Sequence, residues 1–351
     1  MSLVSTQTIC KATSQLSDGR EIVYFDESPG TGRAGFEDTR GLAIPTWQPP
    51  EIRWDPLLGE NVVIAAQRQD RTFLPPADEC PLDPSGPGRA TEIPAPDYDV
   101  VVFENRFPSL RAPHGRCEVM CFTSDHGSSF ASLTPLRVRT VMEAWIDRTV
   151  ALGAMPEVAQ VYCFENRGEE IGVTLSHPHG QIYGYPYLTP RTAAMLQQAA
   201  EHRDVHGGNL FADLLAREVH DGSRIVARTD MFTAFVPFAA RWPVEVHIYP
   251  NRFVHNLLDL AAAELDDFAR IYLDILRRFD RMYSGPLPYI SALHQFADTD
   301  AQRDGYFHVE LMSIRRSAGA LKYLAASESA MDAFISDVTP ETVAERLRGL
   351  G

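Results

Sequence analysis

The segment TLSHPHGQIYGYPY, residues 174–187, places two histidines on either side of a proline and follows them with a glycine and a glutamine. In an extended chain, side chains two positions apart project to one face, so His177, His179 and Gln181 would present three polar groups together. The proline between the histidines donates no backbone N–H, which favours a strand end or edge. Gly180 permits close approach of a ligand to the backbone. We therefore expect a strand end beside a ligand cavity.

The two histidines have three candidate roles: structural core residues, metal ligands, or a nucleophile with its support. A neutral imidazole can attack phosphorus if its other ring nitrogen is held by an acceptor that fixes the tautomer. An isolated histidine is usually structural, but five particular residues in this order argue against that role. The pattern favours a histidine that attacks a nucleotide phosphate.

Composition narrows the class of protein. The chain has 351 residues, of which 44% are hydrophobic, enough for about two domains with a sizeable core. Its formal net charge of -15 argues against a protein whose main ligand is nucleic acid. The sequence begins with no signal-peptide pattern and contains no apolar run of about 18 residues, so we expect a cytoplasmic protein with no membrane contact. The five cysteines are expected to be reduced thiols rather than a disulfide framework.

The elements that must position the motif repeat along the chain. A helical spacing of apolar residues predicts a helix over 135–155. The same order, an alternating strand, a polar turn that ends in histidine and a long amphipathic helix, recurs over 243–283. Strand-like runs occupy 61–66, 98–105, 117–122 and 158–166.

This repetition predicts an α+β fold of two similar halves, each an antiparallel sheet packed with helices. We place the halves at residues 41–195 and 196–351. Residues 1–40 have no sustained period and are interpreted as an N-terminal extension. The proline-dense stretch 75–96 is predicted to be a loop.

With these motifs in view, the sequence resembles the galactose-1-phosphate uridylyltransferase family of the histidine-triad superfamily, from about Arg53 onward. The combination of FEN with HPHGQ is highly specific. The resemblance implies two histidine-triad-like halves. The stretches that carry it are RWDPLLGENVVIAAQRQDR, VVVFENRFPSL, CFTSDH, FENRGEEIGVTLSHPHGQIY, REVHDGSRIV, VPFAARWPVEVHIYPNR and RRSAGALKYLAASE.

The resemblance implies that His179 is the catalytic nucleophile. UDP-glucose would lose glucose 1-phosphate to leave UMP on His179, and galactose 1-phosphate would then accept the uridylyl group, in a ping-pong mechanism. Gln181 is implied to steady the phosphoryl oxygens; hydrolases of the superfamily have a third histidine there, so glutamine favours group transfer.

Two other functions remain open. A nucleoside-diphosphate-sugar or dinucleoside polyphosphate phosphorylase would use the same histidine but accept inorganic phosphate. The second is a nucleotide-binding or zinc-stabilised dimer module without catalytic activity. Such a module would be expected to have substitutions at His179 or Gln181, and both residues are intact.

Further positions match residues that bind the nucleotide in the family. Arginine offers a rigid fork for phosphate oxygens, and Arg68 and Arg71 match two phosphate-facing arginines. Asn105 and Arg106 match an Asn–Asp pair that reads the nucleoside, with arginine in place of the acidic residue. The positions implied to line the phosphates and nucleotide are Asn166, Gly172, Val173 and Thr174.

The segment LKYLAASE matches the family stretch that binds the hexose and comes from the other subunit. The resemblance therefore implies a homodimer whose active site is shared between subunits. Lys322, Tyr323 and Glu328 match, whereas Ala326 and Ser327 replace the usual glycine and tyrosine. Because Ser327 lacks an aromatic ring, the hexose selectivity is left open.

The resemblance also implies a zinc site formed by Cys80, Asp83, His126 and His177. Bacterial members often use two cysteines in the early loop, and Asp83 replaces the second. Thiolate, carboxylate and imidazole all bind zinc. Such an ion would order the loop and hold the strand that presents the nucleophile.

A second implied site lies in the C-terminal half. His294 and His308 match two of its histidines, Glu310 occupies the position of the third, and Met195 replaces a glutamate. Two histidines and a carboxylate can bind iron or zinc. We therefore interpret His294, His308 and Glu310 as a second candidate metal site.

Overall fold

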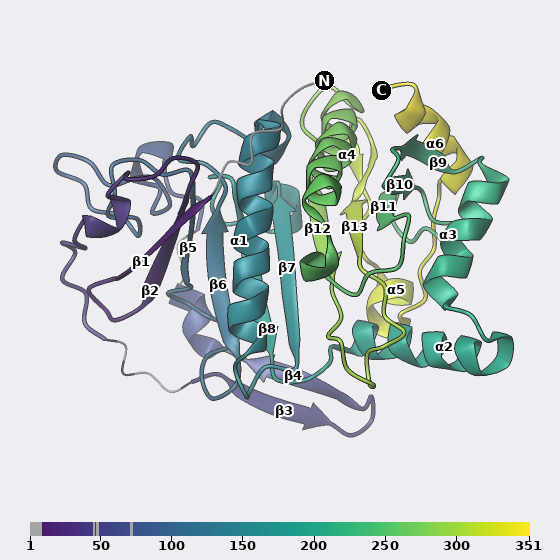
Figure 1. Cartoon of the computed structure of the whole chain (residues 1–351), viewed down its shortest axis with the longest axis horizontal. Coiled ribbons are helices and arrows are strands. Elements are labelled where there is room, and N and C mark those ends of the chain that lie inside the picture. Colours follow the sequence, from purple (N-terminus) through teal and green to yellow (C-terminus); the bar gives the residue numbers. More distant parts are fainter. Residues whose placement is uncertain (1–8, 45, 47–48, 71–72) are drawn as a thin grey trace. The chain divides into compact units, whose positions relative to one another are not determined.

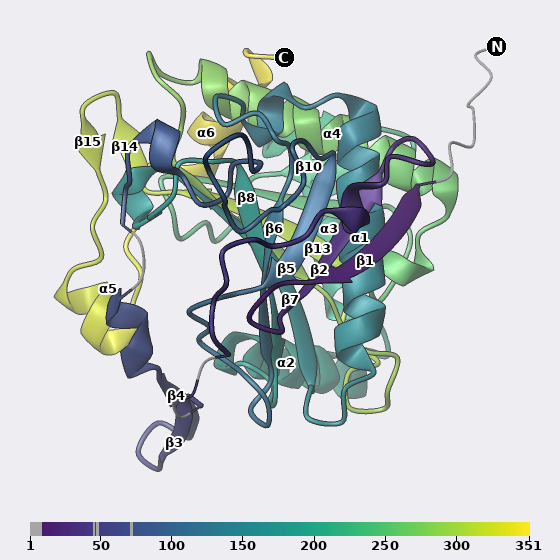
Figure 2. The ribbon, with the colours of Figure 1, turned by 90° about the vertical axis from the view of Figure 1, so that its left-hand side faces the viewer.

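The computed structural model describes residues 9–44, 46, 49–70 and 73–351. The chain divides into two compact units (Figures 1 and 2). The first unit comprises Met1–Val161 and Thr174–Tyr187, and the second comprises Tyr162–Val173 and Leu188–Gly351. The boundaries at residues 40 and 195 stay predictions. Within the described residues, no helix has both the length and the apolar character needed to cross a membrane.

The first unit is built on antiparallel strands with a helix on one face. The helix α1 (Pro135–Gly153) lies next to β5 and β8 (Figure 1) and buries Val141 and Trp145. Thr134 caps its first turn by accepting from Arg137 N, and Pro135 occupies its first position. The strands are neighbours in this order: β1 (Cys10–Gln15), β2 (Glu21–Asp26), β5 (Val100–Glu104), β6 (Arg116–Cys121) and β8 (His179–Tyr185).

Part of the predicted N-terminal extension belongs to this sheet, which corrects the sequence interpretation. β1 and β2 form a hairpin, and β2 pairs with β5. Ile22 and Tyr24 are buried in the core of the unit. The apolar run of β2 is only four residues long and β1 is largely polar, so neither has the sustained period on which the prediction relied.

A second hairpin lies outside the sheet. The strands β3 (Glu51–Asp55) and β4 (Glu60–Ile64) form a separate two-stranded sheet that extends away from the other strands of the unit (Figures 1 and 2). Asp55 Oδ1 accepts from Leu57 N and Gly59 has a φ of 68°, so the turn is held by the Asp55 side chain and by the conformation of Gly59. The short 3-10 helix η2 (Ala66–Asp70) follows.

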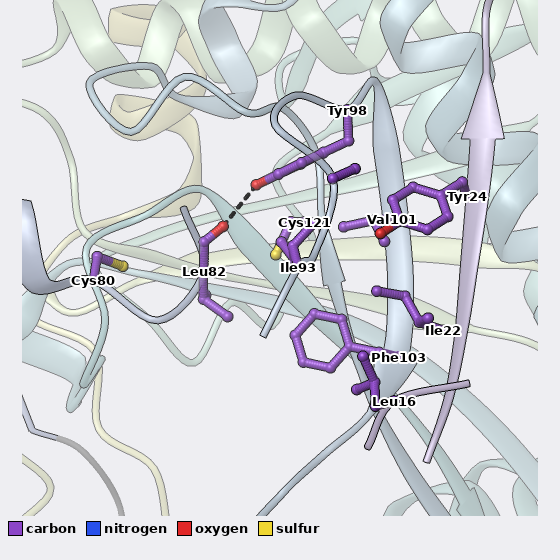
Figure 3. Close-up of a cluster of buried hydrophobic side chains, with 11 residues drawn as sticks. Leu16, Ile22, Tyr24, Cys80, Leu82, Ile93, Tyr98, Val101, Phe103 and Cys121 are labelled. Atoms are coloured by element: carbon purple, nitrogen blue, oxygen red, sulfur yellow. Dashed lines mark hydrogen bonds between the residues drawn. The ribbon is translucent and has the colours of Figure 1, made fainter. Parts of the chain in front are cut away.

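The proline-dense stretch is irregular, as predicted, apart from the 3-10 turn η3 (Ala77–Glu79) and isolated bridges. It packs on the sheet face that α1 does not cover. Figure 3 shows Tyr98 aiming its hydroxyl at the carbonyl oxygen of Leu82, at 2.9 Å, while Ile93 faces Cys121. This packing fixes the backbone around Cys80 and Asp83.

The second unit has its own antiparallel strands, which are neighbours in the order β7 (Gln160–Arg167), β12 (Tyr289–His294), β13 (His308–Ser313), β11 (Val244–Pro250), β10 (Phe232–Phe235) and β9 (Ile225–Arg228). Helix α4 (Ala262–Arg281) buries Phe268, Tyr272 and Ile275, spaced three and four residues apart, against them. A separate cluster packs α2 (Pro190–His206) and α3 (Leu210–Asp221) around Phe235 and Tyr249.

The remaining elements are short: η1 (Arg33–Gly35), η4 (Phe130–Ser132), η5 (Glu169–Ile171), η6 (Leu257–Asp259), β14 (Arg315–Ser317), β15 (Ala320–Leu321), α5 (Ala326–Met331) and α6 (Pro340–Arg348). Strands β14 and β15 form a small hairpin that leads into α5.

The predicted repetition is present in the order of elements. Two strands, a helix and two strands occur as β5, β6, α1, β7 and β8, and again as β10, β11, α4, β12 and β13. β5, β6 and β8 are neighbours in that order, as are β10, β11 and β13. The α+β prediction with antiparallel sheets is confirmed.

Candidate functional site

The proposed nucleophile begins a strand, as predicted. β8 starts at His179, which is paired opposite Cys121 of β6. The Nδ1 atom of His179 lies 2.7 Å from the backbone oxygen of His177, an acceptor, so the ring proton is on Nδ1 and Nε2 carries the lone pair. Burial lowers the pKa of His179, although the carbonyl contact opposes this shift. The arrangement presents a neutral imidazole with a free Nε2.

Gln181 follows His179 by two positions in β8 and is paired opposite Val119. Because of the two-residue period of a strand, its side chain projects to the same face as that of His179. Its Oε1 accepts a hydrogen bond from the hydroxyl of Tyr183.

The structure brings together the four residues of the first implied metal site. The ligand atoms of Cys80, Asp83, His126 and His177 all lie within 4.8 Å of one another. Asp83 Oδ1 is 2.9 Å from Nδ1 of His126 and 2.9 Å from Nδ1 of His177. Cys80 and His177 are buried. Three chemically suitable ligand types thus surround one small space.

Proton positions in this cluster fit a cation. Nε2 of His177 lies 2.8 Å from the carbonyl oxygen of Thr123, so a neutral ring carries its proton there. The lone pair on Nδ1 of His177 then faces Oδ1 of Asp83. These two acceptor atoms lie 2.9 Å apart with no proton between them, which is unfavourable. A second ring proton would resolve the contact, but burial lowers the pKa of His177. A metal ion bound to both atoms resolves it without charging the ring.

Two residues around this cluster were missed by sequence reasoning. The Thr123 carbonyl fixes the His177 tautomer, and the Tyr98 hydroxyl lies 2.7 Å from the same Nε2. Such outer partners orient metal-binding histidines. Tyr98 is the first residue of the predicted strand 98–105, but nothing in its local sequence indicates that its hydroxyl reaches His177.

The second implied metal site also forms a cluster. The ligand atoms of His294, His308 and Glu310 lie within 4.8 Å of one another, and all three residues are buried. His308 Nδ1 donates to the carbonyl oxygen of Tyr306, which directs Nε2 toward Glu310. Nε2 of His294 is buried without a hydrogen-bond partner among the described residues. This nitrogen lies 3.4 Å from Glu310 Oε2, so an imidazole nitrogen and a carboxylate oxygen face the same space, an arrangement that suits two metal ligands.

Arg191, which sequence reasoning missed, also contacts this cluster. Its guanidinium donates to Glu310 Oε2 at 2.6 Å. His247 lies 3.7 Å from Glu310 Oε1 and donates to Glu245 at 3.0 Å. Arg191 therefore supplies a positive charge that is paired with the carboxylate of Glu310.

Among the candidate nucleotide contacts of the first unit, Arg68 lies on the 3-10 helix η2, and Asn105 and Arg106 lie on the turn after β5. Arg68 Nη1 donates to the carbonyl oxygen of Phe107 at 2.9 Å. Asn105 Oδ1 accepts from Phe107 N, which shapes the turn after β5. The half-exposed Arg106 side chain lies 3.8 Å from Glu92 and over the Phe107 ring. Arg71 lies outside the described residues.

The segment before the motif spans both units. Asn166, at the end of β7, is half-buried, and Gly172 has a φ of 81°, a conformation that favours glycine; these two residues and Val173 belong to the second unit. Thr174 belongs to the first unit, where its carbonyl oxygen accepts from Leu74 N at 2.8 Å.

The candidate hexose-binding residues lie on and before α5. Lys322 Nζ donates to Glu328 Oε1 at 2.9 Å, so these two charges are paired within the chain. The Ser327 hydroxyl donates to the carbonyl oxygen of Ala333. Tyr323 is 73% exposed and offers its ring on the surface.

Comparison with known proteins agrees with this fold and motif. The model of the galactose-1-phosphate uridyl transferase N-terminal domain matches residues 110–189, and that of the C-terminal domain matches residues 195–351. A galactose-1-phosphate uridylyltransferase from Streptomyces lividans is 48% identical over 96% of this chain and 97% of its own length. One from Thermotoga maritima is 34% identical over 85% of this chain and 98% of its own.

A solved uridylyltransferase superposes with a TM-score of 0.76 at 30% identity, covering 86% of this chain and 98% of that chain. An ADP-glucose phosphorylase from Arabidopsis thaliana, 18% identical with a TM-score of 0.66, shares the fold. The fold and motif together define a nucleotidyltransferase. More specifically, the chain belongs to the galactose-1-phosphate uridylyltransferase family.

Proposed function

We propose that this protein transfers UMP from UDP-glucose to galactose 1-phosphate through a covalent intermediate on His179. Nε2 attacks the α-phosphorus of UDP-glucose, and glucose 1-phosphate leaves with the electrons of the broken P–O bond. A phosphate oxygen of galactose 1-phosphate then attacks the same phosphorus, the P–N bond breaks, and UDP-galactose departs. The observation that carries the proposal is the Nδ1 contact of His179 with the His177 carbonyl, which leaves Nε2 as the nucleophile.

The surrounding residues have matching roles in this proposal. The imidazolium that forms on attack is stabilised by the His177 carbonyl oxygen, which accepts a hydrogen bond from its Nδ1–H group. The amide of Gln181 and the guanidinium groups of Arg68 and Arg71 donate to the phosphoryl oxygens as charge develops. Asn105, Arg106, Asn166, Gly172, Val173 and Thr174 form the rest of the proposed nucleotide contacts.

The proposal includes a zinc ion held by Cys80, Asp83, His126 and His177. Zinc at this position would supply a structural clasp, and the transfer chemistry belongs to His179. The opposed acceptors Nδ1 of His177 and Oδ1 of Asp83 support it. For the second cluster, His294, His308 and Glu310, we propose iron or zinc. The proposal is supported by the buried Nε2 of His294, which forms no hydrogen bond among the described residues and lies 3.4 Å from Glu310 Oε2.

We also propose a homodimer in which Lys322, Tyr323, Ser327 and Glu328 of one subunit bind the hexose phosphate at the active site of the other. Exposed apolar side chains support an association surface: Leu57 and Leu58 at the tip of the β3–β4 hairpin are 92% and 73% exposed. A reducing, cytoplasmic location is supported by the five cysteines, none of which forms a disulfide bond.

The covalent intermediate provides the decisive experiment. The protein is incubated with UDP-glucose alone, digested and analysed by mass spectrometry for a UMP adduct on the His179 peptide. Galactose 1-phosphate should then discharge the adduct as UDP-galactose. Absence of both the adduct and exchange would contradict the proposal. Discharge by inorganic phosphate with none by galactose 1-phosphate would assign a phosphorylase instead.

A further inference from the structure

Tyr183 lies two residues beyond Gln181 on β8, so the side chains of His179, Gln181 and Tyr183 project to one face of the strand. The Tyr183 hydroxyl donates to Gln181 Oε1 at 3.1 Å, and the residue is 8% exposed. The Tyr183 ring is therefore fixed by packing while its hydroxyl reaches the glutamine.

The hydrogen bond that Tyr183 donates to Oε1 determines which end of the Gln181 amide can bind a ligand. A glutamine amide is planar and has an acceptor oxygen on one side and two donor hydrogens on the other. Because Tyr183 occupies the oxygen, Nε2 is left as the donor for a ligand. A phosphoryl group, which has only acceptor oxygens, requires that orientation.

A second contact holds the hydroxyl itself. Ser109 Oγ lies 3.3 Å from Tyr183 Oη, and because Tyr183 donates to Gln181, the serine is the donor of this pair. Ser109 lies in the loop that begins with Asn105, and the Phe107 carbonyl in this loop accepts from Arg68. Burial raises the pKa of Tyr183 to about 12, which keeps the hydroxyl protonated as a donor. One loop thus contacts both Arg68, directly, and Gln181, through Tyr183, the two residues to which the proposed function assigns the phosphoryl oxygens.

We propose that Tyr183 is a positioning residue that orients the Gln181 amide for uridylyl transfer, an inference that rests on the proposed function. Without the hydroxyl, the amide can rotate and present its oxygen to the phosphoryl group. Loss of one such oriented hydrogen bond should slow formation of the UMP adduct about tenfold while changing UDP-glucose binding little.

The test compares Tyr183→Phe with Tyr24→Phe in the full-length protein. Tyr24 is a buried tyrosine of the same unit whose hydroxyl has no hydrogen-bond partner among the described residues, so its variant controls for the loss of a buried hydroxyl. The rate of UMP-adduct formation is measured in a single turnover with excess UDP-glucose. UDP-glucose affinity is measured separately in a His179→Gly background. We expect the rate to fall in Tyr183→Phe alone and the affinity to stay within about twofold.

A double-mutant cycle separates positioning from general packing. In a Gln181→Ala background, Tyr183→Phe should have no further effect on the rate, because the group through which it acts is gone. Equal effects of Tyr183→Phe with and without Gln181, or a rate equal to wild type, would overturn the inference. If Tyr183→Phe does not fold, Ser109→Ala carries the same cycle. Failure of the wild-type protein to form any adduct would contradict the proposed function itself.

Discussion

The backbone oxygen of His177 accepts from Nδ1 of His179 at 2.7 Å, while the imidazole of His177 contacts Asp83 in the first candidate metal cluster. One residue thus serves the nucleophile through its main chain and the cluster through its side chain. Any disturbance of the cluster that moves His177 also moves the acceptor that fixes the tautomer of His179. The stability of the loop and the reactivity of the nucleophile are therefore linked.

Replacing His179 with glycine should abolish the UMP adduct and lower exchange between UDP-glucose and galactose 1-phosphate at least about a thousandfold, because no other group supplies the nucleophile. The variant should still fold and bind UDP-glucose. Adduct formation is followed by mass spectrometry, and binding by calorimetry. The exposed His220, changed to glutamine, is the control and should retain activity. An adduct that persists in His179→Gly would place the nucleophile elsewhere.

Replacing Asp83 with asparagine should remove zinc and lower the free energy of unfolding by about 2–4 kcal/mol, because a ligand charge and the loop clasp are lost together. Adduct formation should slow as well, through the displaced His177 carbonyl. Metal content is measured by mass spectrometry and stability by thermal denaturation. The exposed Glu79, changed to glutamine, is the matched control on the same segment. Retention of zinc and full stability in Asp83→Asn would contradict the assignment.

Glu165 predicts a pH dependence of stability. Its Oε2 accepts from the Tyr289 hydroxyl at 2.8 Å, and burial raises its pKa from 4.5 to about 7. Between pH 4.5 and about pH 7, the carboxyl group of Glu165 is ionised in the unfolded chain but keeps its proton in the folded chain. This group therefore makes the free energy of unfolding fall as the pH rises, until about pH 7. Glutamine at this position cannot ionise and keeps an acceptor for Tyr289.

Glu165→Gln should therefore exceed wild type in unfolding free energy at pH 8 by up to about 3 kcal/mol and differ little below pH 5. Urea denaturation at both pH values measures the difference. The exposed Glu169, changed to glutamine, should show no such change with pH. An equal effect of Glu165→Gln at both values would contradict the raised pKa.

If the exposed leucines of the β3–β4 hairpin lie in the interface of the proposed dimer, replacing them should weaken it. Because the Asp55 carboxylate and the conformation of Gly59 hold the turn without the leucine side chains, Leu57→Ser with Leu58→Ser should leave the fold intact. Loss of two buried leucines from an interface should raise the dimer dissociation constant at least about tenfold. Sedimentation measures this, and Val205→Ser, which removes an exposed side chain from α2, is the control. An unchanged constant would exclude the hairpin from the interface.

Local patterns in the sequence predicted much of the fold. The helical spacing around Val141 and Trp145 predicted α1, and alternation predicted β5 and β6. The proline between the histidines placed the motif at a strand end, and β8 does begin at His179. In each case, the residues that show the pattern are the same short segment that forms the predicted helix or strand.

The parts that sequence reasoning missed depend on contacts between distant segments. Tyr98 and Thr123 meet His177 from 79 and 54 residues away in the chain. Arg191 of α2 meets Glu310 of β13 from 119 residues away. The β1–β2 hairpin was missed for a related reason, since its burial comes from pairing with β5 rather than from its own composition. Side-chain hydrogen bonds of this kind leave no periodic signal.

The hairpin of β1 and β2 also protects the protein from self-association through its main chain. Removing residues 10–26 would leave the N–H and C=O groups on one side of β5 unpaired and would uncover Tyr98, Val101 and Phe103 beside them. A bare strand edge next to exposed aromatic side chains invites edge-to-edge pairing between molecules. A shortened chain that starts at β3 should therefore precipitate at concentrations at which the full chain stays dispersed.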